Sequence, residues 1–306
     1  MTQKKKQKKP QFKSPIKEVE IFDRKIVRLR REKIASDFQK YDFLNREITN
    51  RLIDNIQDIK RAFNYVLNIG CHSPTIIDHF NRSFIIDQDL SYNMAANAEC
   101  SKIQADEEFL PLKDQSLDLV ISCLNLHWVN DLPGALIQTK RCLKPDGLFL
   151  GAFLGGETLT ELRQSMLKAD MDYHGGISPH ISPFIDVRDA GSLMQRAGFA
   201  LPVVNIERIT ATYSDAFSLM KELKGMGKNN ALVKRQRTLT SPRLMLKVAK
   251  YYHADFALEN GKIPATFDII YLQGWTPHES QQKPLKPGSG NMFLKDALGN
   301  TPPVKA

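Results

Sequence analysis

The sequence predicts an α/β protein whose sheet is parallel and doubly wound. Apolar segments of strand length alternate with segments of helical period through five units between residues 65 and 153. That alternation requires parallel pairing with right-handed crossovers. In addition, an apolar run enters Gly70, and Asp89 follows 19 residues later, which is the outline of a nucleotide-binding turn. We therefore expect a ligand at the carboxyl edge of the sheet.

The first half of the chain supplies the strands that build this sheet. Two amphipathic helices between residues 19 and 55 precede it as an N-terminal cap. A helix begins at Pro74, because proline at the first helical position loses no hydrogen bond. Another helix covers 132–143 and ends in a turn at 144–147, where a proline fixes one dihedral and a glycine permits a positive one. The expected strands are 65–69, 84–87, 101–104, 117–123 and 148–153.

The second half of the chain is richer in helix. Expected helices cover 159–171, 189–197, 216–223 and 241–252, and expected strands cover 203–209 and 267–272. We interpret about 213–260 as a helical insert before the last strand. The domain is expected to cover 18–290, with a basic tail at 1–17 and a flexible C-terminal tail at 291–306, where proline and glycine are frequent.

The net charge of +9 is concentrated at the N-terminus. Residues 1–17 hold seven lysines and no acid, so the remainder carries nine minus seven, or +2. The near-neutral remainder predicts no nucleic-acid partner, and we expect a disordered, solvated tail that could still contact an acidic partner, RNA or an anionic membrane. No apolar run approaches the roughly 20 residues that span a bilayer, so membrane contact is expected only through the tail or a partner.

The four cysteines have neither metal-site nor disulfide-framework spacing. Free thiols are typical of a reducing compartment, and we therefore predict a cytoplasmic protein. The tail has neither the apolar core of a secretory signal nor the arginines of a transit peptide.

The turn after the first strand favours an adenosine-containing ligand without phosphates. Asp89 can accept both ribose hydroxyls, and Asp106 can accept from an adenine amino group. His72 and Pro74 stand where a phosphate-binding loop needs further glycines, which favours S-adenosylmethionine. The alternatives are a purely structural glycine turn and a solvated acidic loop. The predicted cofactor-binding residues are Gly70, Cys71, Asp89, Leu90, Asp106, Glu107 and Cys123.

Two histidines are the candidates for a catalytic role. His127 follows the fourth strand and could orient a substrate or move a proton, although a histidine beside Trp128 could equally pack the top of the sheet. His180 lies in a loop rich in proline and glycine. His174 and His180 lack metal-ligand spacing, so we predict no metal site.

Eight segments carry a resemblance to known proteins, namely 105–111, 126–133, 143–147, 155–163, 175–184, 225–227, 264–266 and 274–281. Together they resemble the family of the mitochondrial complex I assembly factor, a proposed arginine hydroxylase with a methyltransferase fold, and its alphaproteobacterial relatives. The similarity covers Ile21 to about Ser289. A more distant similarity, around Gly274 and in the loop ending at Phe184, is to the malonyl-carrier-protein methyltransferase of biotin synthesis.

The resemblance implies a seven-stranded, Rossmann-like class I methyltransferase fold that binds S-adenosylmethionine. It also implies an enzyme that hydroxylates an arginine in a quinone-module subunit of complex I during assembly, in the mitochondrial matrix if the source is eukaryotic. The alternatives are a methyltransferase acting on a protein or a carrier-bound carboxylate, and an assembly chaperone without catalysis.

The chain departs from the family in its first turn. His72 narrows the space for the methionine part of the cofactor, and Pro74 removes an amide donor. Asn68 replaces a carboxylate with a neutral amide, which weakens hydrogen bonds to the loop. We expect reduced or lost cofactor affinity, with the adenosine contacts of Asp89 and Asp106 retained.

Overall fold

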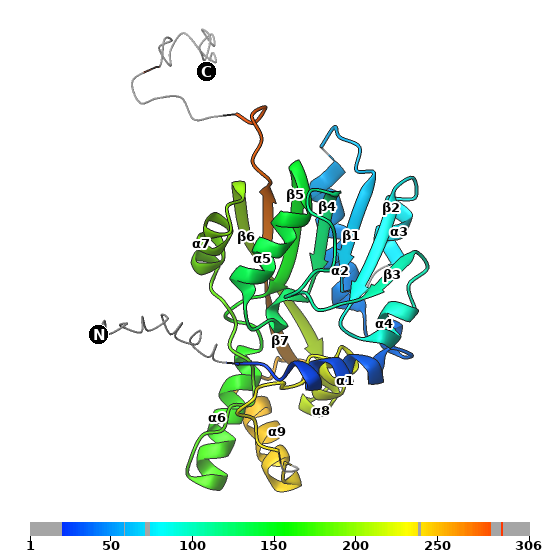
Figure 1. Ribbon diagram of the computed structural model, residues 1–306. Helices are drawn as coiled ribbons and strands as arrows, with labels where there is room; N and C mark the ends of the chain where they lie inside the picture. The colour runs from blue at the N-terminus through cyan, green and yellow to red at the C-terminus, as the bar shows by residue number, and fades with distance from the viewer. Residues whose placement is uncertain (1–19, 58, 71–73, 238–239, 283–288, 290–306) are drawn as a thin grey trace, which may run out of the picture.

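The computed structural model describes residues 20–57, 59–70, 74–237, 240–282 and 289. Its centre is a seven-stranded sheet in the order β3-β2-β1-β4-β5-β7-β6 (Figure 1). The strands are β1 (Tyr65–Ile69), β2 (Phe84–Asp89), β3 (Ser101–Gln104), β4 (Leu117–Cys123), β5 (Leu143–Leu154), β6 (Ala200–Tyr213) and β7 (Ile263–Trp275). Strands β1 to β5 are parallel, and β7 runs antiparallel to both β5 and β6. The predicted doubly wound class I methyltransferase fold is confirmed. The tails predicted at 1–17 and 291–306 lie outside the described residues.

The helices lie on both faces of this sheet and at its carboxyl edge (Figure 1). They are α1 (Arg24–Ile34), α2 (Phe43–Gln57), α3 (Pro74–His79), α4 (Tyr92–Ala96), α5 (Leu132–Cys142), α6 (Thr160–His174), α7 (Val187–Arg196), α8 (Ala216–Gly225) and α9 (Pro242–Phe256), with short 3-10 turns η1 (Phe38–Lys40) and η2 (Leu126–Trp128). As expected, two helices precede β1, and α8 and α9 lie between the last two strands. Helix α6 packs beside α9 below the sheet.

Several predicted boundaries were wrong. The strands predicted at 203–209 and 267–272 are longer at both ends, because β6 and β7 pair along 200–213 and 263–275. The predicted turn at 144–147 lies inside β5, because Leu143 already pairs with Leu117 and a register shift in β4 accommodates the irregular backbone. Asp146 there has a φ of 60°, and its amide donates to the carbonyl of Thr276 at 3.1 Å. Strand β2 continues to Asp89, because that residue still pairs with Gln104 of β3.

Both faces of the sheet are covered, which explains the continuous apolar runs in its central strands. Every residue of β4 is buried. In β5, Leu148 and Leu150 pack into a cluster with residues of α2, whereas Phe149 and Phe153 pack into a second cluster with residues of α5 and α7. This alternation is the period of two that a strand imposes on its side chains. Among the described residues, no helix combines the length and apolar character that a bilayer crossing requires.

Candidate functional site

The carboxyl ends of β1 and β2 bring Gly70 and Asp89 together, as predicted. Gly70 has a φ of 107°, a conformation that favours glycine, and its amide donates to the carbonyl of Gln88 at 2.7 Å. The Asp89 side chain is fully buried and accepts from the amide of Ser91 at 2.7 Å. The guanidinium of Arg31 contacts both residues. It donates to the Asp89 carboxylate, and one of its nitrogens lies 3.3 Å from the Gly70 carbonyl oxygen.

The predicted adenine site adjoins this cluster. Asp106 and Glu107 follow β3, and both carboxylates accept from the guanidinium of Arg24, with a distance of 2.7 Å to Asp106. Asn125 joins the two groups, because its side-chain amide donates to Glu107 and its carbonyl oxygen accepts from Arg31. The predicted acids therefore belong to one network at one edge of the sheet.

Sequence reasoning missed two of the arginines of α1. Arg24 and Arg31 are seven residues apart, or about two helical turns, so they lie on the same face of the helix. Helix α1 crosses the carboxyl edge of the sheet below β1 to β3 (Figure 1). Helix α1, predicted only to cover the sheet, also supplies the cations that pair with the acids predicted to bind a nucleoside.

Burial dominates the electrostatics of this edge. It raises the pKa of Asp89 to about 6, although the positive charge of Arg31 opposes the rise. Asn68 donates to the buried carboxylate of Asp87 at 2.8 Å. The neutral amide at position 68 thus has a structural explanation, since a second carboxylate facing Asp87 would be repelled.

The remaining predicted cofactor residues have different surroundings. Leu90 packs against a small cluster that contains Phe22 and Trp128. Cys123 is buried, and its thiol lies 3.6 Å from the carbonyl oxygen of Asn45 in α2, so a ligand at the carboxyl edge could meet only its backbone. Cys71 and the neighbouring His72 lie outside the described residues.

His127 lies beside a lysine that the sequence did not reveal. The Lys228 ammonium, in the segment after α8, donates to the Leu124 carbonyl at 2.5 Å and lies 3.5 Å from Nε2 of His127. Burial, reinforced by the positive charge of Arg31, lowers the pKa of Lys228 to about 7. Burial and Lys228 together hold the pKa of His127 well below its usual value, so the imidazole is neutral. Lys228 can therefore gain or lose a proton near neutral pH, whereas the imidazole beside it stays neutral.

His180 is held by an aspartate of α6. Its Nε2 lies 2.8 Å from Oδ2 of Asp170, which also accepts from the amide of Ser178 at 2.9 Å. Asp170 is buried, and its second carboxylate oxygen has no partner within the described part of the chain. No group of three metal-ligating side chains occurs among the described residues.

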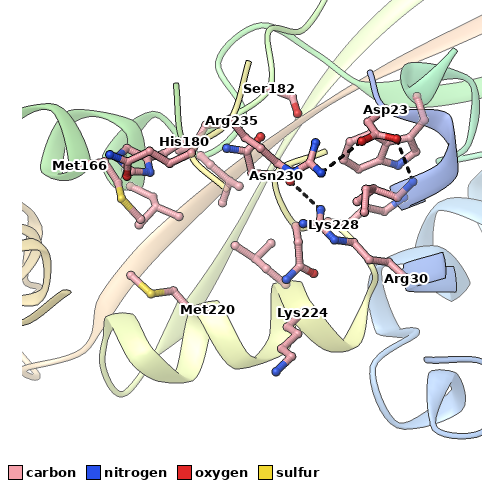
Figure 2. Close-up of a pocket in the computed structure, with 18 of the residues that line it drawn as sticks. Asp23, Arg30, Met166, His180, Ser182, Met220, Lys224, Lys228, Asn230 and Arg235 are labelled. Carbon is pink, nitrogen blue, oxygen red and sulfur yellow. Dashed lines mark hydrogen bonds and ion pairs between the residues drawn. The ribbon is translucent and has the colours of Figure 1, made fainter. Parts of the chain in front are cut away.

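A pocket of about 800 Å³ has both Lys228 and His180 in its wall (Figure 2). Its wall includes Arg30 of α1, His180 and Lys228, and residues of α6 and α8 complete it. Arg30 donates to the carbonyl of Asn230 at 2.6 Å, and Asn230 donates to the carbonyl of Pro179 at 2.6 Å. Helix α1, the loop of His180 and the segment of Lys228 are therefore tied together around one cavity.

Comparisons with known proteins agree with this architecture. A family description, methyltransferase domain, matches residues 67–151. A putative methyltransferase from Bacillus halodurans superposes with a TM-score of 0.53 at 14% identity, covering 75% of this chain and 98% of that one. A Haemonchus contortus phosphoethanolamine N-methyltransferase solved with S-adenosyl-L-methionine has a TM-score of 0.50 at 14% identity, covering 82% of this chain and 60% of that one.

Proteins related in sequence identify the family more narrowly than the structural neighbours do. The mitochondrial arginine-hydroxylase NDUFAF5 of Danio rerio is 41% identical over 286 residues, or 90% of this chain and 89% of its own. The Homo sapiens protein of the same name is 42% identical over 282 residues, or 89% and 81%. A malonyl-[acyl-carrier protein] O-methyltransferase of Methylovorus is 30% identical, covering 84% of this chain and 90% of its own. The chain thus belongs to the family of the arginine-hydroxylases NDUFAF5.

Proposed function

We propose that this protein hydroxylates an arginine side chain of a protein substrate, a quinone-module subunit of respiratory complex I, during assembly of that complex. The observation that carries the proposal is identity of 41% over 90% of the chain with a relative named arginine-hydroxylase. Hydroxylation replaces a carbon–hydrogen bond with a carbon–hydroxyl group. With dioxygen as the oxidant, one oxygen atom enters the arginine and the other leaves as water, which consumes two protons and two electrons from an external reductant. We place the activity where complex I is assembled, in the bacterial cytoplasm or the mitochondrial matrix.

A comparison of cells with and without the gene tests this function directly. We expect mass spectrometry of the complex I subunit to show one added oxygen atom on an arginine in wild-type cells and none in the deletion strain. Growth under labelled dioxygen should place the label on that arginine. Loss of complex I while the arginine is unmodified even in wild-type cells would contradict the proposal and favour a chaperone.

We also propose that S-adenosylmethionine binds at the edge formed by Gly70, Asp89 and Asp106. The fit rests on a glycine turn with positive φ beside a buried carboxylate that ends β2. A carboxylate has about four acceptor positions, so Asp89 has room for ribose hydroxyls in addition to Arg31 and the Ser91 amide. Because Asp89 is fully buried, its neighbours must shift to admit the ribose. This cofactor supplies a sulfonium cation with a transferable methyl group.

Cofactor affinity should depend on pH through Asp89. A ribose hydroxyl needs the ionised carboxylate as acceptor, and the pKa of Asp89 is raised to about 6. We expect the dissociation constant of S-adenosylmethionine, measured by calorimetry, to rise about tenfold between about pH 7 and about pH 5. The Asp89→Asn variant should bind weakly at both pH values, whereas Lys228→Met should keep the dependence. Equal affinity of the wild-type protein at both pH values would exclude Asp89 as the ribose acceptor.

Methyl transfer is the second candidate function, because a relative of 30% identity is named malonyl-[acyl-carrier protein] O-methyltransferase. Incubation with S-adenosylmethionine carrying a labelled methyl group distinguishes the two. Label in the complex I subunit or in a carrier-bound carboxylate would support methyl transfer, and label in neither would favour hydroxylation.

A further inference from the structure

The pocket beside the proposed cofactor site has an unbalanced charge. The basic residues that line it are Lys25, Arg30, Lys224, Lys228, Arg235 and Arg237. Asp23 is the single acid among the described lining residues, and it is already paired with Arg235 at 3.2 Å. Figure 2 shows Lys224 pointing away from Arg30 and Lys228, so its charge lies apart from theirs. The remaining cations create a positive potential that attracts carboxylates.

The charges and the apolar surface of the pocket are separated. Lys25 and Arg237 are exposed, and Arg30 is half-buried. The apolar part of the lining is buried and includes Leu154, Leu159, Leu162 and Phe267. A small anion within the apolar part would lose its hydration without gaining a partner. A polypeptide segment can instead place an aliphatic side-chain stem there while its neighbouring carboxylates meet the cations at the rim.

The opposite end of the pocket suits a guanidinium. Figure 2 shows His180 beside Met166, across the pocket from Arg30 and Lys228. Because Asp170 can only accept when ionised, Nε2 of His180 carries the hydrogen of their 2.8 Å bond. In a neutral ring the other nitrogen, Nδ1, is then an acceptor. The buried charge of Asp170, with one oxygen unpartnered among the described residues, adds a negative potential at this end.

We propose that this pocket selects an arginine flanked by acidic residues. The arginine stem lies on the apolar floor, its guanidinium lies toward His180 and Asp170, and the flanking carboxylates pair with Lys25, Arg30 and Arg237. The inference rests on the hydroxylase function proposed above and names the sequence context that the enzyme recognises.

Synthetic peptides test the selection without altering the protein. One peptide carries a central arginine between aspartates, the second has asparagines in their place, and the third keeps the aspartates but has norleucine for arginine. We expect the first to bind the full-length protein about tenfold more tightly than either of the others by fluorescence anisotropy, since each exposed ion pair contributes modestly and two of them act together. Equal affinity for the aspartate and asparagine peptides overturns the proposal.

Protein variants locate the two ends of the pocket. Arg237→Glu should abolish the preference for aspartate over asparagine, whereas Arg196→Glu on the distant helix α7 should preserve it. Asp170→Asn should remove the preference for arginine over norleucine and leave the preference for aspartate intact. If Arg196→Glu has the same effect as Arg237→Glu, the preference reflects overall charge and the pocket is not its source.

The outcome is separable from that of the hydroxylase proposal. Tight binding of the acidic peptide without oxygen incorporation would contradict the activity and retain the recognition. Hydroxylation of both the aspartate and asparagine peptides with equal affinity would retain the activity and overturn the recognition.

Discussion

Replacing Arg31 with methionine is expected to lower the free energy of unfolding by about 3–5 kcal/mol, because it leaves the Asp89 carboxylate buried without its charged partner. Asp89 is fully buried and Arg31 is nearly so, which means that water cannot replace the lost interaction. Urea unfolding followed by circular dichroism measures the change.

The double variant Arg31→Met with Asp89→Asn provides the decisive comparison. Removing both charges should recover most of the lost free energy, since a neutral pair avoids the desolvation of either ion. Arg28→Met, at an exposed position of the same helix, should change the free energy of unfolding by less than about 0.5 kcal/mol. If Arg31→Met costs no more than Arg28→Met, the ion pair contributes nothing to folding.

Replacing Lys228 with methionine is expected to stabilise the protein and to abolish most of its activity. The pKa of Lys228 falls from 10.5 to about 7, so the folded state disfavours the charged form. Each pKa unit corresponds to about 1.4 kcal/mol, and because the residue is only partly buried we expect a gain of about 2–3 kcal/mol near neutral pH. Hydroxylation should fall by about a hundredfold or more, the usual contribution of a group that transfers a proton.

The pH dependence of unfolding identifies the origin of that gain. The unfolded chain binds more protons than the folded one between about pH 7 and 10.5, so the wild-type free energy of unfolding should rise with pH across this window. Lys228→Met should flatten this rise. A variant that is less stable than the wild type, or equally active, would show that Lys228 is a structural residue. A cation that lowers the stability of the folded state is expected at positions where function requires it.

Most of the sheet could be predicted from the sequence. The strands 65–69 and 117–123 were placed without error because each is a short apolar run bounded by polar or turn residues. The strand 101–104 was also placed without error, although Ile103 is its only apolar residue. Gly70, Asp89 and Asp106 were expected at one edge, since parallel strands align their carboxyl ends. The structure brings all three together there. The turn at 144–147 was misplaced because strand pairing with Leu117 outweighed the local preference of its proline and glycine.

The groups that decide the chemistry depend on the tertiary structure. Arg31 reaches Asp89 across 58 residues of sequence, and Lys228 reaches His127 across 101. Those contacts form when α1 and the segment after α8 pack against the sheet. The spacing of apolar residues along the sequence does not show where these segments pack. The sequence by itself determined the order of the strands along the chain, the edge of the sheet where we propose the cofactor site, and the family. Only the tertiary structure decided which cations face which acids. Burial and proximity between distant parts of the chain determine the ion pairs and the pKa values of these groups, and neither exists in an unfolded chain.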